Sequence, residues 1–427
     1  MQTKNVLQTL FDTALEFISP DYLIKNQCKV QDDTLVVNAQ EYKLLEYEHI
    51  YLLGSGKAAW SMAKALSSLL SQYLSSGVIV SPVCQEELEK IECLSSDHPI
   101  PSERSLKGAQ ALITSCKMHQ ENDLYIYLLS GGSSSLIELP VEGVSLEAFQ
   151  MTTDVMLKNA LNIEEINTVR KHLSSIKGGR LAQFSKAQGL VLCISDVIGD
   201  DLYSIGSAPL YADTSSYEDA LAILKSYQIE DKVPSSVRNY LEEGVANLHL
   251  ETPKKVSKKV HHELIGSNFL AKEAVYKKAQ SLGLDAVMIE GYIDSDVNEA
   301  VDKILELALN SPHKVIIFGG EVTVKVEGEG QGGRNQHAVL CMLKRVKEQN
   351  LRLSFLSAGT DGIDGNSDAA GAYIDTQTLE QVEALGLDID SYLKANDSYH
   401  FFKALDNLIM RGPTGTNVMD IMILIKE

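Results

Sequence analysis

Residues 50–60 read IYLLGSGKAAW, an apolar run that leads through a glycine turn into a helical pattern reaching about Ser71. Continuous apolar runs of this length are typical of buried parallel strands, and a glycine turn that feeds a helix completes a strand–helix unit. Similar runs at 77–80, 124–129 and 190–194 end in Gly, Ser or Asp, and helical patterns such as 106–119 and 148–157 lie between them. This alternation predicts an α/β fold with a Rossmann-like parallel sheet, in which ligands bind outside the carboxyl ends of the strands.

The second half of the chain repeats the α/β character with a different order of elements. Helical patterns lie at 268–282, 297–309 and 335–347, and strand patterns lie at 314–318, 322–326, 353–357 and 421–425. Before them, residues 251–260 contain Pro253 and four lysines but few apolar residues. Because a chain of 427 residues exceeds the usual size of one hydrophobic core, we expect two domains, 1–252 and 253–427. The apolar stripe between Val6 and Ile18 predicts an N-terminal helix.

Composition narrows the classes of partner. Lys and Arg number 38 against 58 Asp and Glu, and the resulting net charge of −20 disfavours nucleic acid and anionic membranes as partners. No run of about 18 apolar residues and no signal peptide is visible in the sequence, so no membrane span is expected. The six cysteines form no CxxC pair, and we expect them to be reduced core thiols in a cytoplasmic chain. A small anionic ligand stays compatible with this composition if Lys and Arg cluster locally.

The glycine turn at 54–59 satisfies the dinucleotide pattern GxGxx[GA]. The acidic residue that would bind a ribose is missing, because the next apolar run leads into Ser81 and Pro82. A P-loop is excluded, since Tyr51 replaces its first glycine and Ala58 replaces the Ser/Thr that holds Mg²⁺. The turn therefore predicts a general anion site, and a tight turn with a solvated lysine is the alternative. Its residues are Gly54, Ser55, Gly56 and Lys57.

Two further motifs belong to the first domain. The loop at 130–135 offers glycine amides and serine hydroxyls to a ligand through Gly131, Gly132, Ser133 and Ser134, unless it is only a flexible loop. Residues 166–180 predict a helix with an apolar stripe and a C-cap at Gly178-Gly179. Asn167, Arg170, Ser174 and Lys177 share its opposite face, which lines an anion cleft or is solvated surface, and His172 is interpreted as structural.

Two aspartates directly follow predicted strands. Asp196 follows the run 190–194. A carboxylate at the end of a strand is expected to hold Mg²⁺ or to accept a proton. Asp361 follows 353–357 and is the best second Mg²⁺ ligand, whereas Asp364 and Asp368 are interpreted as turn residues.

The most distinctive motif is the glycine-rich segment 328–333 that precedes Arg334. Exposed amides, a helix N-terminus and a guanidinium group are expected to meet there, around Gly332, Gly333 and Asn335. Cations, amides and isolated carboxylates together are what phosphoryl transfer requires.

Seven of these segments occur in an order that resembles one known family. They are GSGKAAWSMA (54–63), LLSGGSSSL (128–136), INTVRKHLSSIKGGRLA (166–182), SDVIGDD (195–201), GQGGRNQ (330–336), AGTDGIDGNSDAAGA (358–372) and GPTGTNV (412–418). The chain resembles the glycerate 2-kinase family, whose C-terminal part is called the MOFRL domain. The resemblance runs from about residue 5 to the end of the chain.

The resemblance implies ATP- and Mg²⁺-dependent phosphorylation of D-glycerate at its 2-hydroxyl. It also implies a second α/β domain with a mixed sheet, a cleft between the domains, and catalytic roles for Lys57 and Arg334. Asn268, at the start of the helix 268–282, completes the expected substrate- or phosphate-binding set. Ser133, where relatives have a third glycine, and the stretch 208–210 depart from the family pattern, so the exact hydroxy acid stays open.

Two other functions stay open at this stage. One is an NAD(P)H-dependent hydroxypyruvate reductase, which only the glycine turn supports, and the other is a non-catalytic anion-binding protein. In every case we expect small-molecule partners and a cytoplasmic monomer or homodimer.

Overall fold

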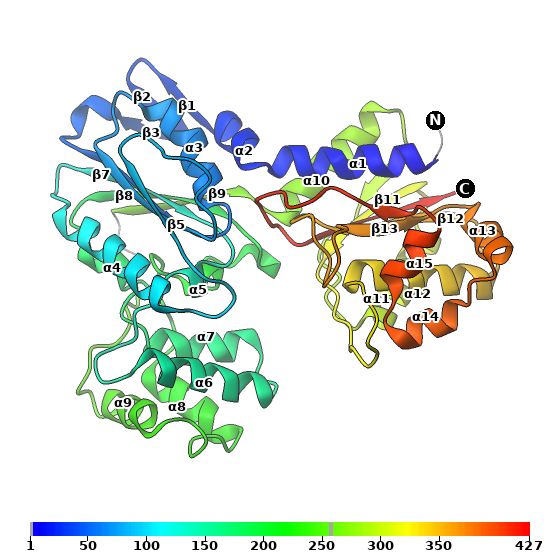
Figure 1. Ribbon diagram of the computed structural model, residues 1–427. Coiled ribbons are helices and arrows are strands. Elements are labelled where there is room, and N and C mark those ends of the chain that lie inside the picture. The colour runs from blue at the N-terminus through cyan, green and yellow to red at the C-terminus, as the bar shows by residue number, and fades with distance from the viewer. Residues whose placement is uncertain (1–2, 256–258) are drawn as a thin grey trace. The chain divides into compact units, whose positions relative to one another are not determined.

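The computed structural model describes residues 3–255 and 259–427, which form two compact units. The N-terminal unit is Leu23–Ile265, and the C-terminal unit is Gly266–Glu427 together with the segment that carries helix α1 (Thr3–Ile18). Each unit has its own sheet (Figure 1). This division differs from the expected boundary at 252/253, because β9 (Val260–Gly266) still belongs to the first sheet. Residues 256–258 of the expected linker lie outside the described residues.

The sheet of the N-terminal unit has the strand order β6-β5-β4-β7-β8-β9. All four neighbouring pairs from β6 to β8 are parallel. The strands are β4 (Ile50–Ser55), β5 (Ser76–Ser81), β6 (Ile91–Ser95), β7 (Leu124–Leu129) and β8 (Gln188–Ile194). In chain order this is 3-2-1-4-5-6, the order of dinucleotide-binding sheets, and it reverses between β4 and β7. The Rossmann-like first domain is thus confirmed, and its ligand crevice is expected beyond β4 and β7.

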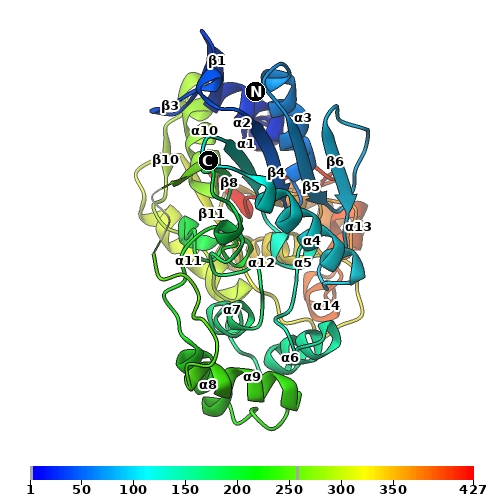
Figure 2. The ribbon, with the colours of Figure 1, turned by 90° about the vertical axis from the view of Figure 1, so that its left-hand side faces the viewer.

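Helices pack on this sheet, and further helices of the same unit form a separate apolar core. Helix α3 (Ala59–Leu70) packs on β4 and β5, and α4 (Glu103–Met118) packs on β5 and β6; Figure 2 shows β4, β5 and β6 side by side near α4. A separate apolar core holds together α6 (Leu146–Lys158), α7 (Ile163–His172), α8 (Tyr217–Ser226) and α9 (Ser235–Val245). A small antiparallel sheet consists of β1 (Cys28–Gln31), β2 (Thr34–Val37) and β3 (Gln40–Lys43).

The helix predicted over 166–180 is only partly correct. Helix α7 ends at His172, so Ser174 and Lys177 do not continue the helical face that carries Asn167 and Arg170. Gly178 and Gly179 have φ values of +59° and +84°, but they lie in a turn after the helix and do not cap it. The interpretation of His172 as structural agrees with its full burial and its Nδ1 contact with Thr168 O (2.8 Å).

The C-terminal unit has a mixed sheet of order β10-β11-β15-β12-β13-β14. Its strands are β10 (Ala286–Met288), β11 (Val315–Gly320), β12 (Leu353–Gly359), β13 (Gly371–Ile374), β14 (Leu408–Ile409) and β15 (Asp420–Lys426). Only β10 and β11 pair in parallel, and β15 lies antiparallel between β11 and β12. The apolar C-terminal run is therefore a buried strand of the sheet, as predicted.

Helices cover both faces of this second sheet (Figure 1). Helix α1 packs against α10 (Asn268–Ser281), which explains why the N-terminal segment belongs to the C-terminal unit. The other face carries α11 (Val297–Asn310), α12 (Arg334–Gln349), α14 (Ile389–Ala395) and α15 (Ser398–Ala404), and α13 (Thr378–Leu385) contributes Val382 to the same core. The strand predicted at 322–326 is wrong: Thr323 forms only an isolated bridge with Asp296, and Val326 is 72% exposed.

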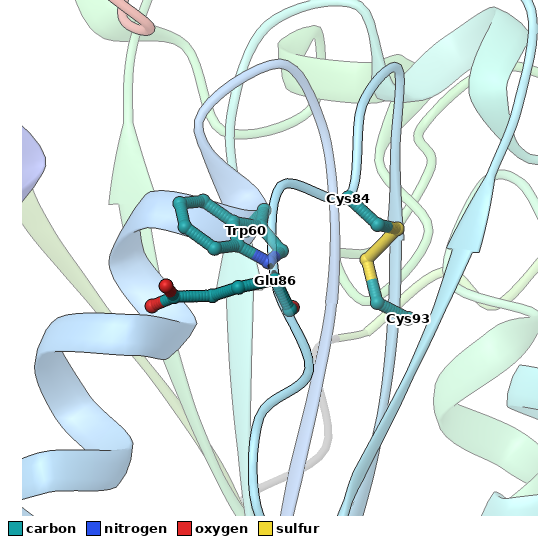
Figure 3. Close-up of a disulfide and its surroundings, with 4 residues drawn as sticks. All are labelled: Trp60, Cys84, Glu86 and Cys93. Atoms are coloured by element: carbon teal, nitrogen blue, oxygen red, sulfur yellow. Dashed lines mark hydrogen bonds between the residues drawn. A yellow bond between two sulfur atoms is a disulfide. The ribbon is translucent and has the colours of Figure 1, made fainter.

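The expectation of reduced cysteines holds for only part of the set. Cys84 and Cys93 form a disulfide across the loop between β5 and β6 (Figure 3), whereas Cys28, Cys116, Cys193 and Cys341 are free and buried. The sequence spacing did not predict this pair, because it does not show that β6 pairs with β5. This pairing brings Cys93 close to the residues that follow β5. Among the described residues, no helix is long and apolar enough to cross a membrane.

Candidate functional site

The turn after β4 fixes the backbone of Lys57 at the point where the strand order reverses. Gly54 and Ser55 end β4, and Gly56 has φ +133° and lies so close to Ser130 that a Cβ would overlap its backbone and hydroxyl. Only glycine fits this position, because the left-handed backbone and the close approach both exclude a side chain. The motif therefore brings β4 into contact with the loop that follows β7.

The amides of this turn are already bonded within the unit. Those of residues 56–58 donate to acceptors on neighbouring strand ends: Val80 O at 3.2 Å, Gly131 O at 2.9 Å and Ser130 Oγ at 3.0 Å. Each amide carries one hydrogen, so these donors do not serve a ligand. The turn that was predicted to bind an anion through its amides is thus a tight turn. Its Lys57 side chain is the group that it presents to a ligand.

The serine loop after β7 provides the open amides instead. Gly132, with φ +79°, precedes the short helix α5 (Ser133–Leu136). In the part of the chain that the structure describes, the amides of residues 131–134 donate to no protein acceptor. Two of the predicted ligand hydroxyls are engaged elsewhere, because Ser55 Oγ contacts Ser133 Oγ at 2.5 Å and Tyr127 Oη at 2.6 Å in the buried interior. Ser134 Oγ contacts Ser207 Oγ at 2.7 Å.

Asp196 follows β8 and lies against the same loop. Its carboxylate is so close to Gly131 that a Cβ there would overlap it. Burial raises the pKa of Asp196, and the positive charge of Lys57 partly offsets that rise. The Asp196 carboxylate accepts a hydrogen bond from its own backbone amide, and among the described residues neither it nor the Lys57 ammonium has an opposite charge within salt-bridge distance. One carboxylate and one ammonium group are thus left for a ligand.

Sequence reasoning missed His98 at this site. A Cβ on Gly132 would lie 3.0 Å from His98 Cδ2 and 3.1 Å from Lys57 Cγ, so the imidazole and the lysine stem flank the glycine. Burial and the nearby charge of Lys57 lower the pKa of His98 to about 4, so the ring is neutral at pH 7. The HPIP segment after β6 was the available signal, since a His beside prolines follows a strand of the sheet.

Arg170 and Lys177 lie beneath the serine loop and not on a solvated face. Arg170 Nη2 donates to Ser134 O at 3.0 Å, and burial lowers the pKa of Arg170. Lys177 pairs with the fully buried Glu138 at 2.9 Å, and burial lowers the pKa of Lys177 to about 8. Arg170 thus supports the backbone of α5, which is a positioning role for a residue predicted to bind ligand.

In the C-terminal unit, Arg334 is the first residue of α12 and is held by two carboxylates. Its Nε and Nη2 donate to Asp420 Oδ2 and Oδ1 at 2.7 and 3.0 Å, and Nη1 lies 2.6 Å from Glu321 Oε1. Burial opposes the charge, but the two carboxylates outweigh it and raise the pKa of Arg334. Sequence analysis identified the arginine and missed both partners, although Asp420 stands at the start of an apolar run.

The start of α12 is occupied by a protein carboxylate. Asp364 accepts the amides of Asn335 and Gln336 at 3.1 and 2.8 Å, and burial raises its pKa to about 6 against these hydrogen bonds. A Cβ on Gly333 would overlap the same residue, and the Gly332 amide donates to Asn366 Oδ1 at 2.8 Å. Asp364 thus caps the helix where a simple turn was predicted, and it occupies the amides of Asn335 and Gln336 at the predicted anion site.

Asn268 and Asp361 lie close to the Arg334–Asp420 pair. Asn268 is fully buried, and its Nδ2 donates to Val418 O and Asp420 O, both at 2.9 Å. A Cβ on Gly359 would lie 3.0 Å from Asp361 Oδ1 and 3.4 Å from Asp420 Oδ1. Asn268 thus fixes the start of β15, and Asp361, whose Oδ1 accepts the Ile363 amide at 3.2 Å, adds a second carboxylate beside Asp420.

These arrangements define an α/β protein of two units, each of which places a cationic side chain, Lys57 or Arg334, beside strand ends of its sheet. Family models describe the two parts of the chain: residues 6–242 match "Domain of unknown function (DUF4147)" and residues 314–420 match the MOFRL family. The chain is 38% identical to a glycerate 2-kinase of Pyrococcus horikoshii, covering 100% of this chain and 98% of that protein.

A D-glycerate 2-kinase of Thermotoga maritima is 40% identical over 89% of this chain and 91% of its own length. A crystal structure of a glycerate kinase from the same organism superposes with a TM-score of 0.87 at 36% identity, covering 100% of this chain and 99% of the other. The chain belongs to the glycerate 2-kinase family.

Proposed function

We propose that the protein transfers the γ-phosphoryl group of ATP to the 2-hydroxyl of D-glycerate, giving 2-phosphoglycerate and ADP. The observation that carries the proposal is near-complete alignment with two glycerate 2-kinases at 38% and 40% identity. The geometry supports the same chemistry, because phosphoryl transfer needs positioning and charge neutralisation more than a covalent catalyst. Lys57, Asp196 and the open amides of the serine loop supply these elements in the N-terminal unit.

Each side chain has a defined part in this proposal. The Lys57 ammonium neutralises negative charge on phosphate oxygens, and the amides of residues 132–134 donate to the same oxygens. Arg334 binds an anionic group of a substrate through its guanidinium. Asp196 accepts a hydrogen bond from the attacking hydroxyl or holds the metal ion.

The residues present fit a Mg²⁺ ion bound together with ATP. Mg²⁺ is usually held by one or two carboxylates plus substrate phosphates, and among the described residues no opposite charge lies within salt-bridge distance of the Asp196 carboxylate. Asp196 of the N-terminal unit and, separately, Asp361 of the C-terminal unit are the proposed carboxylate ligands. The ion would neutralise phosphate charge as the phosphoryl group is transferred.

The test is a two-signal assay on the purified protein with MgATP and D-glycerate. ADP release is measured directly, and 2-phosphoglycerate is detected with enolase in the absence of phosphoglycerate mutase. Both signals support the proposal. ADP release without an enolase signal means another phosphorylation position or uncoupled hydrolysis, and no ADP release contradicts kinase activity toward glycerate.

The strand order of the first sheet favours a second candidate, the NAD(P)H-dependent hydroxypyruvate reductase. A dinucleotide pyrophosphate needs free amides at the glycine turn, however, and those of residues 56–58 are bonded internally. Strand β5 also ends at Ser81, without a carboxylate for the ribose. Loss of NADH absorbance on addition of hydroxypyruvate would support the reductase, and we expect none.

A further inference from the structure

His98 lies beside the open amides of the serine loop. A Cβ on Gly132 would lie 3.0 Å from its Cδ2 and 3.3 Å from its Nε2, so the Nε2 edge of the ring faces the loop backbone. The same Cβ would lie 3.1 Å from Lys57 Cγ, and a Cβ on Gly131 would overlap the Asp196 carboxylate. The imidazole, the lysine side chain and the carboxylate therefore all border the same two glycines.

The segment that carries His98 is anchored on both sides of it. Ser96, which follows β6, donates from its Oγ to Leu136 O at 2.7 Å. On the other side, Pro101 O accepts a hydrogen bond from Gln150 Nε2 at 2.6 Å. Because Leu136 is the last residue of α5, the Ser96 bond ties this segment to the helix whose first amides are open. The backbone of His98 is thus held in place beside the loop.

The imidazole of His98 is available to a ligand. In the part of the chain that the structure describes, the ring forms no hydrogen bond or ion pair. The residue is exposed to solvent, although partial burial of the ring and the charge of Lys57 lower its pKa to about 4. A neutral imidazole carries one N–H donor and one acceptor nitrogen. At pH 7, His98 therefore offers a donor without adding a charge to the site.

The groups around the two glycines indicate which part of a ligand lies there. The Lys57 ammonium, the amides of residues 132–134 and a neutral imidazole can all donate to oxygen atoms, as a phosphate group requires. In the proposed reaction, Asp196 contacts the attacking hydroxyl or the metal ion, and both of these contact the γ-phosphoryl group of the nucleotide. The phosphate beside Asp196 is therefore the γ-phosphoryl group.

We propose that His98 is a further substrate-binding residue, which donates a hydrogen bond from Nε2 to an oxygen of the γ-phosphoryl group of ATP. Lys57 supplies the charge that neutralises this group. His98 supplies direction, because a ring N–H bonds well only to an oxygen that lies close to its own axis. This inference rests on the proposed function, because it takes the γ-phosphoryl group of ATP as the group that is transferred.

The experiment compares His98→Leu and His98→Gln with wild type. Leucine has no donor, whereas the glutamine amide can place an N–H near the position of the imidazole Nε2. His261→Gln is the control, because His261 is an exposed histidine on β9 in the same unit. Calorimetry measures binding of the non-hydrolysable ATP analogue adenylyl imidodiphosphate and of ADP, both with Mg²⁺. Urea denaturation checks the fold, and His98→Ala replaces His98→Leu if the larger side chain prevents folding.

We expect His98→Leu to raise the Kd of the analogue about 10-fold. The Kd of ADP should stay within about twofold of wild type, because ADP lacks the γ-phosphoryl group. His98→Gln should raise the Kd of the analogue less than about threefold. With MgATP and D-glycerate, kcat/KM should fall about 10- to 100-fold in His98→Leu and recover partly in His98→Gln. His261→Gln should behave as wild type in every assay.

Three results would overturn the inference. Unchanged analogue affinity and turnover in folded His98→Leu would mean that the imidazole does not contact the phosphate. Equal losses of analogue and ADP affinity would assign His98 to another part of the nucleotide. Equal loss of turnover in His98→Gln and His98→Leu, with wild-type analogue affinity, would assign His98 to proton transfer.

The analogue titration separates this inference from the proposed function. A selective loss of analogue affinity in His98→Leu, in a protein that does not phosphorylate glycerate, supports the contact and refutes only the activity. Glycerate phosphorylation with full analogue affinity and turnover in His98→Leu refutes only the contact.

Discussion

Lys57 in the N-terminal unit and Arg334 in the C-terminal unit are surrounded in opposite ways. Among the described residues, the Lys57 ammonium has no carboxylate within salt-bridge distance, and its position comes from backbone bonds of the turn to the loop after β7. The Arg334 guanidinium is placed by side chains, with Asp420 and Glu321 on three of its nitrogen atoms. A cation without a protein partner interacts first with a ligand, whereas a paired cation is kept in place by the fold. Replacing Lys57 should therefore change activity alone. Removing a carboxylate partner of Arg334 should also change the free energy of unfolding.

Lys57→Ala is the largest expected effect on activity. Removing an essential electrostatic contact costs about 3–4 kcal/mol of transition-state stabilisation, so kcat/KM should fall about 10²- to 10³-fold. The unfolding free energy should change by less than about 0.5 kcal/mol, because the ammonium pairs with no described residue. Lys64→Ala is the control, since Lys64 pairs with Glu86 at 2.8 Å on the exposed face of α3. Wild-type kinetics for Lys57→Ala would remove Lys57 from the mechanism.

Asp420→Asn tests the paired side of the comparison. The change leaves Arg334 without its buried countercharge, and breaking such a pair costs about 3 kcal/mol. Urea denaturation should show this loss, together with reduced kcat. The surface pair of Asp302 with Arg345, at 2.7 Å, supplies the control: Asp302→Asn should cost less than about 1 kcal/mol. Equal denaturation midpoints for the two variants would mean that Asp420 contributes no more than a surface carboxylate.

Asp364→Asn probes the cap of α12 through pH. Burial raises the pKa of Asp364 to about 6, so the folded state binds a proton more tightly than the unfolded state, in which Asp titrates near 4. Its contribution to stability is present below about pH 4 and is lost as pH rises through 6, at up to about 1.4 kcal/mol per pH unit. In Asp364→Asn this part of the pH dependence should be absent. Asp368→Asn, which changes an exposed carboxylate of the same loop, should keep the wild-type profile.

Local patterns in the sequence predicted most of the fold and the two cations. Strands β4, β7, β8 and β15 follow from apolar runs, and Lys57 and Arg334 follow from glycine motifs beside helices. What the sequence could not show is which group pairs with which across the chain. Asp420 lies 86 positions from Arg334, and the acceptors for the glycine-turn amides come from two other strand ends. The early end of α7 was missed because the apolar stripe continues past His172, where Lys177 turns inward to Glu138.

The smallest expected effect concerns the backbone that supports the Lys57 site. Gly206, Ser207 and Ala208 have φ values of +59°, +59° and +54°, and Ser207 Oγ contacts Ser134 Oγ in the serine loop. An alanine in the left-handed conformation costs about 1–2 kcal/mol. A glycine avoids this cost, but it loses more conformational entropy on folding, which offsets part of the gain. Ala208→Gly should therefore stabilise the protein by about 0.5–1 kcal/mol, measured by urea denaturation.

Ala111→Gly, a change within helix α4, is the matched control and should destabilise by about 1 kcal/mol. Opposite signs for the same chemical substitution would show that the stretch 206–208 stores backbone strain. Because Ser207 O and Ala208 O accept the amides of Gly178 and Gly179 at 3.1 and 2.7 Å, the relaxed backbone should keep these bonds and leave kcat unchanged. A fall in kcat with increased stability would mean that the strained turn sets the position of Ser134. The Lys57 site would then depend on strain held in its backbone, in contrast to the Arg334 site, which depends on charge pairs.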